Sequence, residues 1–192
     1  EPVEDVARIL EGYHAAIAAR VFDHGVVGRL HAAASVPVVN MLSDRSHPLQ
    51  ALADALTMRQ QLSPLAAKTV AYVGDYNNVA RSLAEVSAML GMHVRFGCPP
   101  GFAADEAELE RILLLGAASV EQSNRPSDAV AGAHAVHTDT WVSMGQEADK
   151  DARRRAFEGF QVDTDTMAGA DPSAVFMHCL PAYRGFEVAA DV

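Results

Sequence analysis

Short apolar runs alternate with helical patterns along this chain, and this alternation constrains the fold more than any other feature. The clearest run covers residues 69–73, which are apolar on both faces of a pleated strand. A strand of this kind belongs in a parallel sheet that helices cover on both sides. Strand–helix–strand repetition predicts right-handed βαβ units. We therefore expect an α/β fold with parallel sheets and flanking helices.

The same patterns place the individual elements. Helices are predicted from apolar periodicity within residues 3–10, 27–34, 48–56, 79–90 and 109–113. Strands are predicted at residues 17–19, 37–39, 69–73, 93–96, 118–120, 133–136 and 174–177. Pro48 opens its helix at a favoured first-turn position, with Leu49, Leu52 and Leu56 on one face.

A break in periodicity divides the chain into two lobes. Residues 60–68 contain Ser63-Pro64 and fit neither pattern. We therefore predict one domain over residues 1–59 and a second over residues 60–192. The first has only about two strands, too few for a normal sheet, so we expect it to be incomplete and the chain to be part of a larger protein.

Composition narrows the class of protein. At 192 residues and 49% apolar content, the chain can bury a core and is expected to be soluble. It has no run of about 20 apolar residues, as a membrane span requires, and its first residues do not read as a leader, so we do not expect secretion. Two cysteines are too few for a disulfide framework and favour a reducing cytoplasm. The net charge of −10 argues against nucleic acid as a partner but leaves room for an anionic substrate.

Five polar segments next to predicted strands and helices are candidate sites. They are Arg20, the run Ser46-His47-Pro48-Leu49-Gln50, the turn Gly74-Asp75-Tyr76-Asn77-Asn78, the loop Asp139-Thr140-Trp141-Val142-Ser143-Met144-Gly145-Gln146-Glu147, and the turn His178-Cys179-Leu180-Pro181. Open parallel sheets bind ligands beyond the carboxyl ends of their strands. The loop that begins at Asp139 combines an acid, a hydroxyl and a thioether, which suits a small amine-bearing ligand.

Each candidate also has a purely structural interpretation. Arg20 alone is better explained as a surface cation, and His47 alone as a turn or cap residue. With Gln50 one turn further on, however, His47 lies at a helix N-terminus, which favours anions and carbonyl oxygens. Cys179 alone is better explained as a buried, inert thiol. Its place at a strand end, before the rigid Leu180-Pro181 turn, favours a position in a cleft.

The remaining polar residues exclude several kinds of site. Asn77 or Asn78 can serve simply as the cap of the next helix. His134 and His137 should face opposite sides of a strand, so a shared metal is not expected. The basic run at residues 150–155 is interpreted as a solvated helical face. We find no dinucleotide fingerprint, Walker loop or nucleophile elbow, and predict neither a cofactor nor a metal.

Taken together, six segments resemble those of one enzyme family. They are residues 17–22 (IAARVF), 37–40 (PVVN), 47–54 (HPLQALAD), 74–80 (GDYNNVA), 139–147 (DTWVSMGQE) and 178–182 (HCLPA). The Ser-Met-Gly loop and the His-Cys-Leu-Pro turn are the specific ones. The chain resembles the aspartate/ornithine carbamoyltransferases, and within them the ornithine carbamoyltransferases. The resemblance implies two α/β domains, one for carbamoyl phosphate and one for the amino acid.

The resemblance also implies a role for each matching residue. Carbamoyl phosphate would be held by Arg20, His47, Gln50, Cys179 and Leu180, of which Arg20, His47 and Cys179 would act at the reacting centre. Ornithine would be held by Asn78, Asp139, Ser143 and Met144.

The implied reaction suits these residue types. The δ-amine of ornithine loses its proton, attacks the carbamoyl carbon and displaces phosphate. Arg20 and His47 would stabilise the developing charge. Asp139 would pair with the α-ammonium group and Asn78 with the α-carboxylate. Cys179 would orient the δ-nitrogen or accept its proton, without acting as a covalent nucleophile.

The chain also departs from the family pattern. It has no early Ser-x-Arg-Thr phosphate loop, and it ends before a late arginine that the family carries. Tyr76 replaces a residue that is usually small, and Tyr183 replaces a usual His or Arg. We therefore expect a chain truncated at both ends that binds carbamoyl phosphate poorly.

The sequence is also compatible with other functions. Within the family, the loop at residues 139–147 favours ornithine over aspartate, putrescine or acetylornithine. From another class, a non-catalytic fragment or paralogue would keep only the amino-acid-binding lobe. A nucleotide-binding α/β domain is a third, weaker interpretation. By resemblance, the full-length protein is expected to be a cytoplasmic homotrimer that acts on small molecules and not on nucleic acid or membranes.

Overall fold

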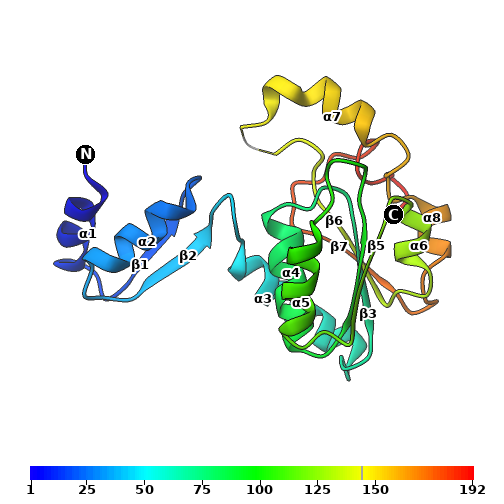
Figure 1. Ribbon diagram of the computed structural model, residues 1–192, viewed down its shortest axis with the longest axis horizontal. Helices are drawn as coiled ribbons and strands as arrows, with labels where there is room; N and C mark the ends of the chain where they lie inside the picture. The colour runs from blue at the N-terminus through cyan, green and yellow to red at the C-terminus, as the bar shows by residue number, and fades with distance from the viewer. Residues whose placement is uncertain (144) are drawn as a thin grey trace.

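The structure, a computed structural model that describes residues 1–143 and 145–192, consists of two lobes joined by a short connection (Figure 1). The smaller lobe contains α1 (Val3–Glu11), β1 (Ile17–Arg20), α2 (His24–Ala33) and β2 (Val38–Leu42). The larger contains α3 (Pro48–Leu62), β3 (Thr69–Val73), α4 (Asn78–Met89), β4 (His93–Gly97), α5 (Glu106–Leu114), β5 (Ser119–Ser123), α6 (Pro126–Val130), β6 (Ala135–Thr138), the 3-10 turn η1 (Glu147–Asp149), α7 (Lys150–Ala156), α8 (Thr164–Ala168) and β7 (Val175–His178). The predicted α/β fold with parallel sheets is confirmed.

The larger sheet has the strand order β5-β4-β3-β6-β7, and all its pairs are parallel. The chain builds outward from β3 through β4 to β5, then returns to the other side of β3 as β6. The order therefore reverses between β3 and β6. Such a reversal opens a crevice beyond the carboxyl ends of the two strands. The turn after β3 and the loop that starts at Asp139 both leave the sheet there.

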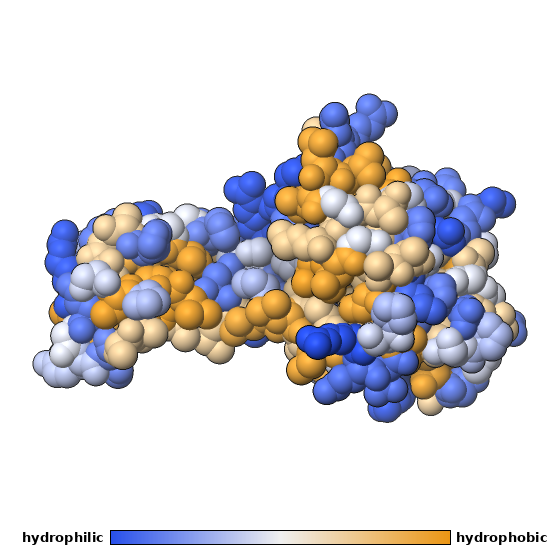
Figure 2. All heavy atoms as spheres, turned by 90° about the horizontal axis from the view of Figure 1, so that it is seen from below, coloured by the Kyte–Doolittle hydropathy of each residue, from blue (hydrophilic) through white to orange (hydrophobic). Residues whose placement is uncertain are grey.

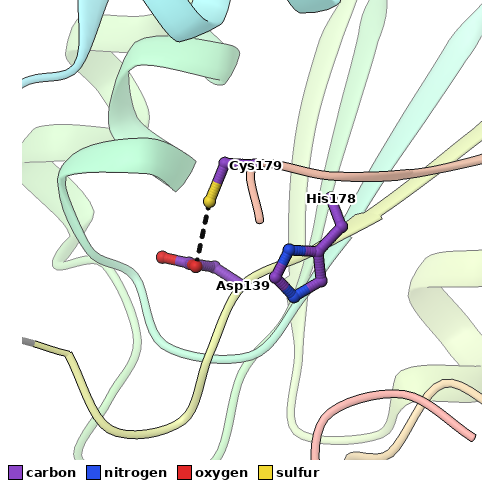
Figure 3. Close-up of side chains that lie close together, drawn as sticks. All are labelled: Asp139, His178 and Cys179. Carbon is purple, nitrogen blue, oxygen red and sulfur yellow. Dashed lines mark hydrogen bonds between the residues drawn. The ribbon is translucent and has the colours of Figure 1, made fainter. Parts of the chain in front are cut away.

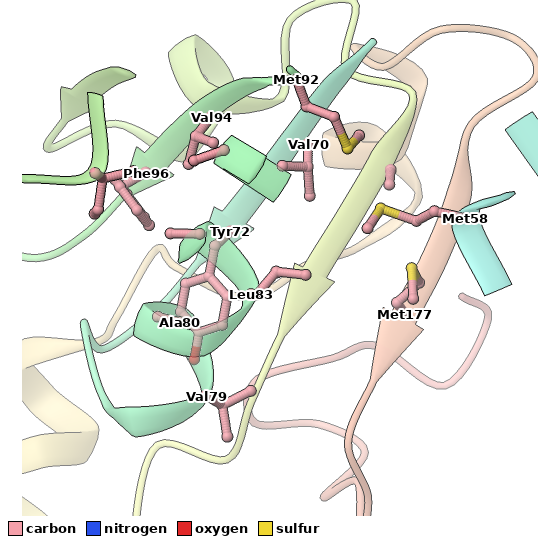
Figure 4. Packing of buried hydrophobic residues seen from close by; sticks show 14 of the residues in the cluster. Met58, Val70, Tyr72, Val79, Ala80, Leu83, Met92, Val94, Phe96 and Met177 are labelled. Carbon is pink, nitrogen blue, oxygen red and sulfur yellow. The ribbon is translucent and has the colours of Figure 1, made fainter. Parts of the chain in front are cut away.

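Helices cover both faces of this sheet, with α3, α4 and α5 on one side and α6 and α8 on the other (Figure 1). Every residue of β3 is buried as a result. Figure 4 shows the core beneath α3 and α4, where Tyr72 and Val70 of β3 pack with Leu83 and Met58. The opposite core is built around Phe157, Val136 and Trp141. Two full cores make this lobe a rigid base for the site.

The smaller lobe is built more sparsely. Its parallel strands β1 and β2 pair from Ile17 with Val38 onward, and α1 packs against α2. Its buried core residues are Ala7, Ala19 and Leu30. Alternate residues of β2 are exposed, including Val39 and Met41. Figure 2 shows apolar side chains gathered on this lobe and near its junction with the larger one.

Helix α3 buries a different face from the one that its leucines suggest. Leu52 is 60% exposed, and Leu49 and Leu56 are exposed as well. The buried side of α3 instead carries Ala51, Asp54, Met58 and Leu62. The leucine spacing therefore predicted the helix correctly but did not identify its packed face.

None of the described helices is both long and apolar enough to cross a membrane.

Candidate functional site

A cavity of about 640 Å³ lies between the lobes and is bounded by the carboxyl ends of β1, β3, β6 and β7. Its lining includes eight of the nine residues that the sequence singled out: Arg20, His47, Gln50, Asn78, Asp139, Ser143, Cys179 and Leu180. Met144, the ninth, lies outside the described residues. Residues far apart in the sequence thus meet at the switch point, as the strand order requires.

One side of the cavity carries cationic and amide groups. Arg20 ends β1, and His47 immediately precedes α3, where its backbone N–H donates to Ser82 Oγ at 2.9 Å. Burial lowers the pKa of His47 below its ordinary value, and the Arg20 charge lowers it further. His47 is therefore a neutral imidazole at neutral pH. Its buried Nδ1 has no hydrogen-bond partner among the described residues.

Asp139 is the anion at the centre of the opposite side. It is buried, and its two carboxylate oxygens accept hydrogen bonds from different neighbours. Oδ2 accepts from Asn77 Nδ2 at 2.7 Å, and Oδ1 accepts from the backbone N–H of Thr140 at 2.7 Å. Asn77 is itself fixed, because its Oδ1 caps α4 by accepting from the N–H groups of Val79 and Ala80. The helix cap thus holds the carboxylate in place.

Cys179 lies directly against Asp139 (Figure 3). Its thiol donates to Asp139 Oδ1, with an S···O distance of 3.0 Å. Burial and the negative charge of Asp139 raise the pKa of the Cys179 thiol well above its ordinary value. The group therefore remains a protonated thiol at neutral pH and is a poor nucleophile, since the thiolate is the reactive form.

Hydrogen bonds also fix the turn that carries Cys179. His178 Nδ1 accepts from the backbone N–H of Leu180 at 2.8 Å, while Nε2 lies 3.2 Å from Glu187 Oε1. Because Nδ1 accepts the Leu180 hydrogen bond, Nε2 is the ring nitrogen that donates to Glu187. Leu180 has a φ of 57°, a left-handed conformation that is uncommon for a residue other than glycine. The turn is thus held in one unusual shape at the cavity wall.

Contacts across the junction connect the lobes next to the site. Asn78 Nδ2 donates to the backbone carbonyl of Ser43 at 2.7 Å. Ser43 Oγ lies 2.8 Å from His24 Nδ1 of the smaller lobe. Asn78 and Asn77 thus have different roles: Asn77 caps the helix, and Asn78 faces the junction.

Sequence reasoning missed an ion pair that supports the loop after β6. Arg153 of α7 binds Asp75 and donates from Nε to the carbonyl of Trp141 at 2.6 Å. Its guanidinium group also lies over the rings of Phe102 and Phe157. The interpretation of residues 150–155 as a solvated face is therefore wrong for Arg153. The sequence of this short basic run carried no signal for the pairing, because Arg153 does not differ there from the exposed Arg154 and Arg155 beside it.

A smaller cavity of about 290 Å³ adjoins the main one. The two share the wall formed by Thr140, Val142, Ser143 and Tyr183, and the smaller one reaches Lys150 and Arg154 of α7. The loop at residues 139–143 therefore separates two neighbouring spaces.

Asp139, His178 and Cys179 also offer three ligand atoms within 4.8 Å of one another. All three residues already make hydrogen bonds within the protein. Both His178 nitrogens are engaged, and the Cys179 thiol donates to Asp139. A metal would have to displace these contacts. Among the described residues, His134 and His137 belong to no such cluster, and His134 Nδ1 accepts from the Thr69 backbone N–H instead.

Comparison with known proteins agrees with this arrangement. Residues 1–60 match the carbamoyl-P binding domain of aspartate/ornithine carbamoyltransferase, and residues 66–192 match its Asp/Orn binding domain. Ornithine carbamoyltransferases of Thermus thermophilus and Parasynechococcus marenigrum are 48% and 47% identical over the whole chain.

Solved structures give the same result. The ornithine carbamoyltransferase of Pyrococcus furiosus superposes with a TM-score of 0.93 at 45% identity and that of Thermus thermophilus with 0.89 at 45%. The matches cover 100% and 99% of this chain but only 62% and 61% of those chains. The chain therefore spans about three fifths of the length of its relatives. Domain matches over nearly every residue, close relatives and a shared fold show that this chain belongs to the aspartate/ornithine carbamoyltransferase family.

Proposed function

We propose that this protein transfers the carbamoyl group of carbamoyl phosphate to the δ-amine of ornithine, giving citrulline and phosphate. The observation that carries the proposal is the single cavity in which Arg20, His47 and Gln50 face Asp139 and Cys179. The Arg20 guanidinium, the neutral His47 imidazole and the Gln50 amide on one side suit an acyl phosphate, and an anion on the other suits an amino acid. Residues 1–59 would supply the first half and residues 60–192 the second.

In this proposal, Asp139 binds the α-ammonium group of ornithine, with Asn78 holding the α-carboxylate and Ser143 and Met144 completing the pocket. Asn78 would exchange its contact with the Ser43 carbonyl for one with the substrate. The raised pKa of Cys179 supports the orienting role over the proton-accepting one, because a protonated thiol cannot take up a proton. Ornithine would therefore have to lose its δ-proton to another acceptor.

At the other side of the cavity, Arg20 would bind the phosphate group, and neutral His47 would donate a hydrogen bond to the carbamoyl oxygen. Donors aimed at developing charge stabilise the transition state. Gln50 and the carbonyl of Leu180 would hold the carbamoyl NH2 group. A role in arginine biosynthesis, a cytoplasmic location and a homotrimer belong to the same proposal, by similarity to the family.

A product assay tests the reaction. The polypeptide encoded by the complete reading frame is incubated with carbamoyl phosphate and, separately, ornithine, acetylornithine, putrescine or aspartate. We expect carbamoylated product from ornithine alone. Turnover of another acceptor in place of ornithine would refute the substrate, and no turnover with any acceptor would refute the enzyme proposal.

One observation favours a second candidate, an amino-acid-binding lobe without catalysis. The larger lobe has a five-stranded sheet around Asp139, whereas the smaller has a two-stranded sheet. Calorimetry separates the two candidates, because a binding lobe would bind ornithine and show no heat with carbamoyl phosphate.

A further inference from the structure

Behind the cavity wall lies a buried polar array that the proposed reaction does not itself require. Asp54 of α3 is 4% exposed, and His137 of β6 is fully buried. Asp54 Oδ2 lies 3.4 Å from His137 Nε2, and Asp54 Oδ1 accepts a hydrogen bond from Gln50 Nε2 at 2.9 Å. Of the three residues, only Gln50 lines the cavity. The array thus connects the cavity wall to the interior of the larger sheet.

Packing alone does not explain a carboxylate at this position. The same face of α3 buries Met58 and Leu62 in the main core. Burying a charged group costs free energy, and replacing a buried pair with apolar side chains is often neutral or stabilising. Leucine or methionine would therefore serve the core at least as well as Asp54. A buried carboxyl group that hydrogen-bonds a residue of the cavity wall points to a role in the site.

The chemistry of the carboxylate specifies what that role is. An ionised carboxylate only accepts hydrogen bonds, whereas a glutamine amide has a donor end and an acceptor end. Asp54 therefore holds the NH2 end of Gln50 and leaves Oε1 to serve the cavity. His137 lies on the far side of Asp54, where Asp54 Oδ2 and His137 Nε2 are 3.4 Å apart without a hydrogen bond between them, and its ring stacks on Tyr72 with centroids 5.7 Å apart.

We propose that Asp54 is a positioning residue that fixes the polarity of the Gln50 amide and so makes the cavity select carbamoyl over acyl phosphates. Gln50 Oε1 can accept a hydrogen bond from the NH2 group of carbamoyl phosphate. The methyl group of acetyl phosphate would leave this oxygen without a partner. Sites built to hydrogen-bond a polar group reject analogues that lack it. The inference rests on the proposed function, because it assigns Gln50 to the carbamoyl NH2 group.

The first test needs no substrate and no variant. Side-chain amide hydrogen exchange is measured by NMR on the wild-type protein for Gln50 and for Gln60, which is exposed on the same helix. We expect exchange at Gln50 to be at least ~10-fold slower, because its NH2 group is bonded to a buried carboxylate. Equal exchange at the two residues would overturn the proposal whatever the protein catalyses.

The second test compares two ligands. Dissociation constants for carbamoyl phosphate and acetyl phosphate are measured on the polypeptide encoded by the complete reading frame, as wild type and as Asp54→Asn, whose amide can face Gln50 with either end. We expect the wild type to prefer carbamoyl phosphate and the preference to fall ~10-fold in the variant. The KM for ornithine, measured on the polypeptide encoded by the complete reading frame, should differ little between the wild type and Asp54→Asn.

A double-mutant cycle with Gln50→Leu shows whether Asp54 acts on the ligand preference through Gln50. Once Gln50 is absent, Asp54→Asn should have no further effect on the preference. If Asp54→Asn weakens both ligands equally, Asp54 is merely structural and the inference fails while the proposed function stands. If the wild type binds neither ligand, the inference and the carbamoyl-phosphate half of the proposed function fail together.

Discussion

At the scale of single residues, the site depends on two groups whose pKa values are shifted by their surroundings in the folded protein. Cys179 is held as a thiol by burial and by Asp139, and His47 is held neutral by burial and by Arg20. Both residues therefore contribute hydrogen bonds and shape at neutral pH, without adding charge. Asp139 remains the acceptor on which Cys179, Asn77 and the proposed ornithine contact converge.

Alkylation of Cys179 tests the raised pKa of its thiol. Because its pKa is raised, we expect slow labelling by iodoacetamide at pH 7 to 9 and a rate that rises about tenfold per pH unit. Asp139→Asn removes the negative charge and should accelerate labelling roughly tenfold at a given pH. Site-resolved mass spectrometry separates Cys179 from Cys98, whose pKa burial raises to about 12. Asp165→Asn, an exposed acid on α8, is the control. Fast labelling of the wild type at pH 7 would contradict the geometry.

The pH dependence of stability tests the lowered pKa of His47. The pKa of His47 is lower in the folded protein than its ordinary value of 6.5, so the unfolded chain binds the proton more readily. The free energy of unfolding should therefore fall as pH drops through 6.5 and stop falling below the folded pKa. Urea titrations between pH 5 and 8 should show a weaker dependence in His47→Gln. An unchanged pH dependence in this variant would assign the effect to other groups, such as His134, whose pKa is also lowered.

At the scale of secondary-structure elements, the sequence predicted strands β1 to β7, helices α1 to α5 and the edge of the sheet where the site forms, but it missed the short helices α6 and α8. Periodicity reports the kind of element, and a parallel sheet then places its loops. It could not show which side of α3 is packed, because leucines occupy the exposed side and Asp54 the buried one. It also could not pair Arg153 with Asp75, or Asp54 with His137. Those contacts depend on how separate elements meet in space.

Two substitutions in α3 test directly which side of this helix is packed against the core. Met58→Ala should lower the free energy of unfolding by about 2–5 kcal/mol, because it empties part of a packed core. Leu52→Gln should change it by no more than about 0.5 kcal/mol, since that side chain is 60% exposed. Urea denaturation at fixed pH compares the two. A loss for Leu52→Gln as large as that for Met58→Ala would show that the leucine side is the packed one.

At the scale of the whole molecule, two unequal lobes enclose the proposed site. The larger lobe brings two buried cores and the carboxyl ends of β3, β6 and β7, while the smaller brings Arg20 and a sparse core. Its exposed apolar residues, such as Val39 and Met41, are a surface on which we expect the 192-residue chain to self-associate. Sedimentation across a range of concentrations measures this, and a monomer at all of them would contradict it.

The resemblance seen in six short segments and the family shown by comparison agree, while the residue roles stay proposals. The Ser-Met-Gly and His-Cys-Leu-Pro segments indicated the family because they are unusual in composition, not because their geometry was known. Their meeting at Asp139 and Cys179 is what the structure adds. The proposed function therefore depends most on Asp139 as the anchor of an amino acid.

Calorimetric titration of ornithine, with and without carbamoyl phosphate, tests that claim most directly. It is carried out on the wild type, on Asp139→Asn and on the control Asp165→Asn. We predict saturable binding of one ornithine per chain by the wild type and the control, and at least ~10-fold weaker binding by Asp139→Asn, because a buried charge pair is lost. Equal affinity in all three proteins, or no binding by the wild type under either condition, would contradict the account.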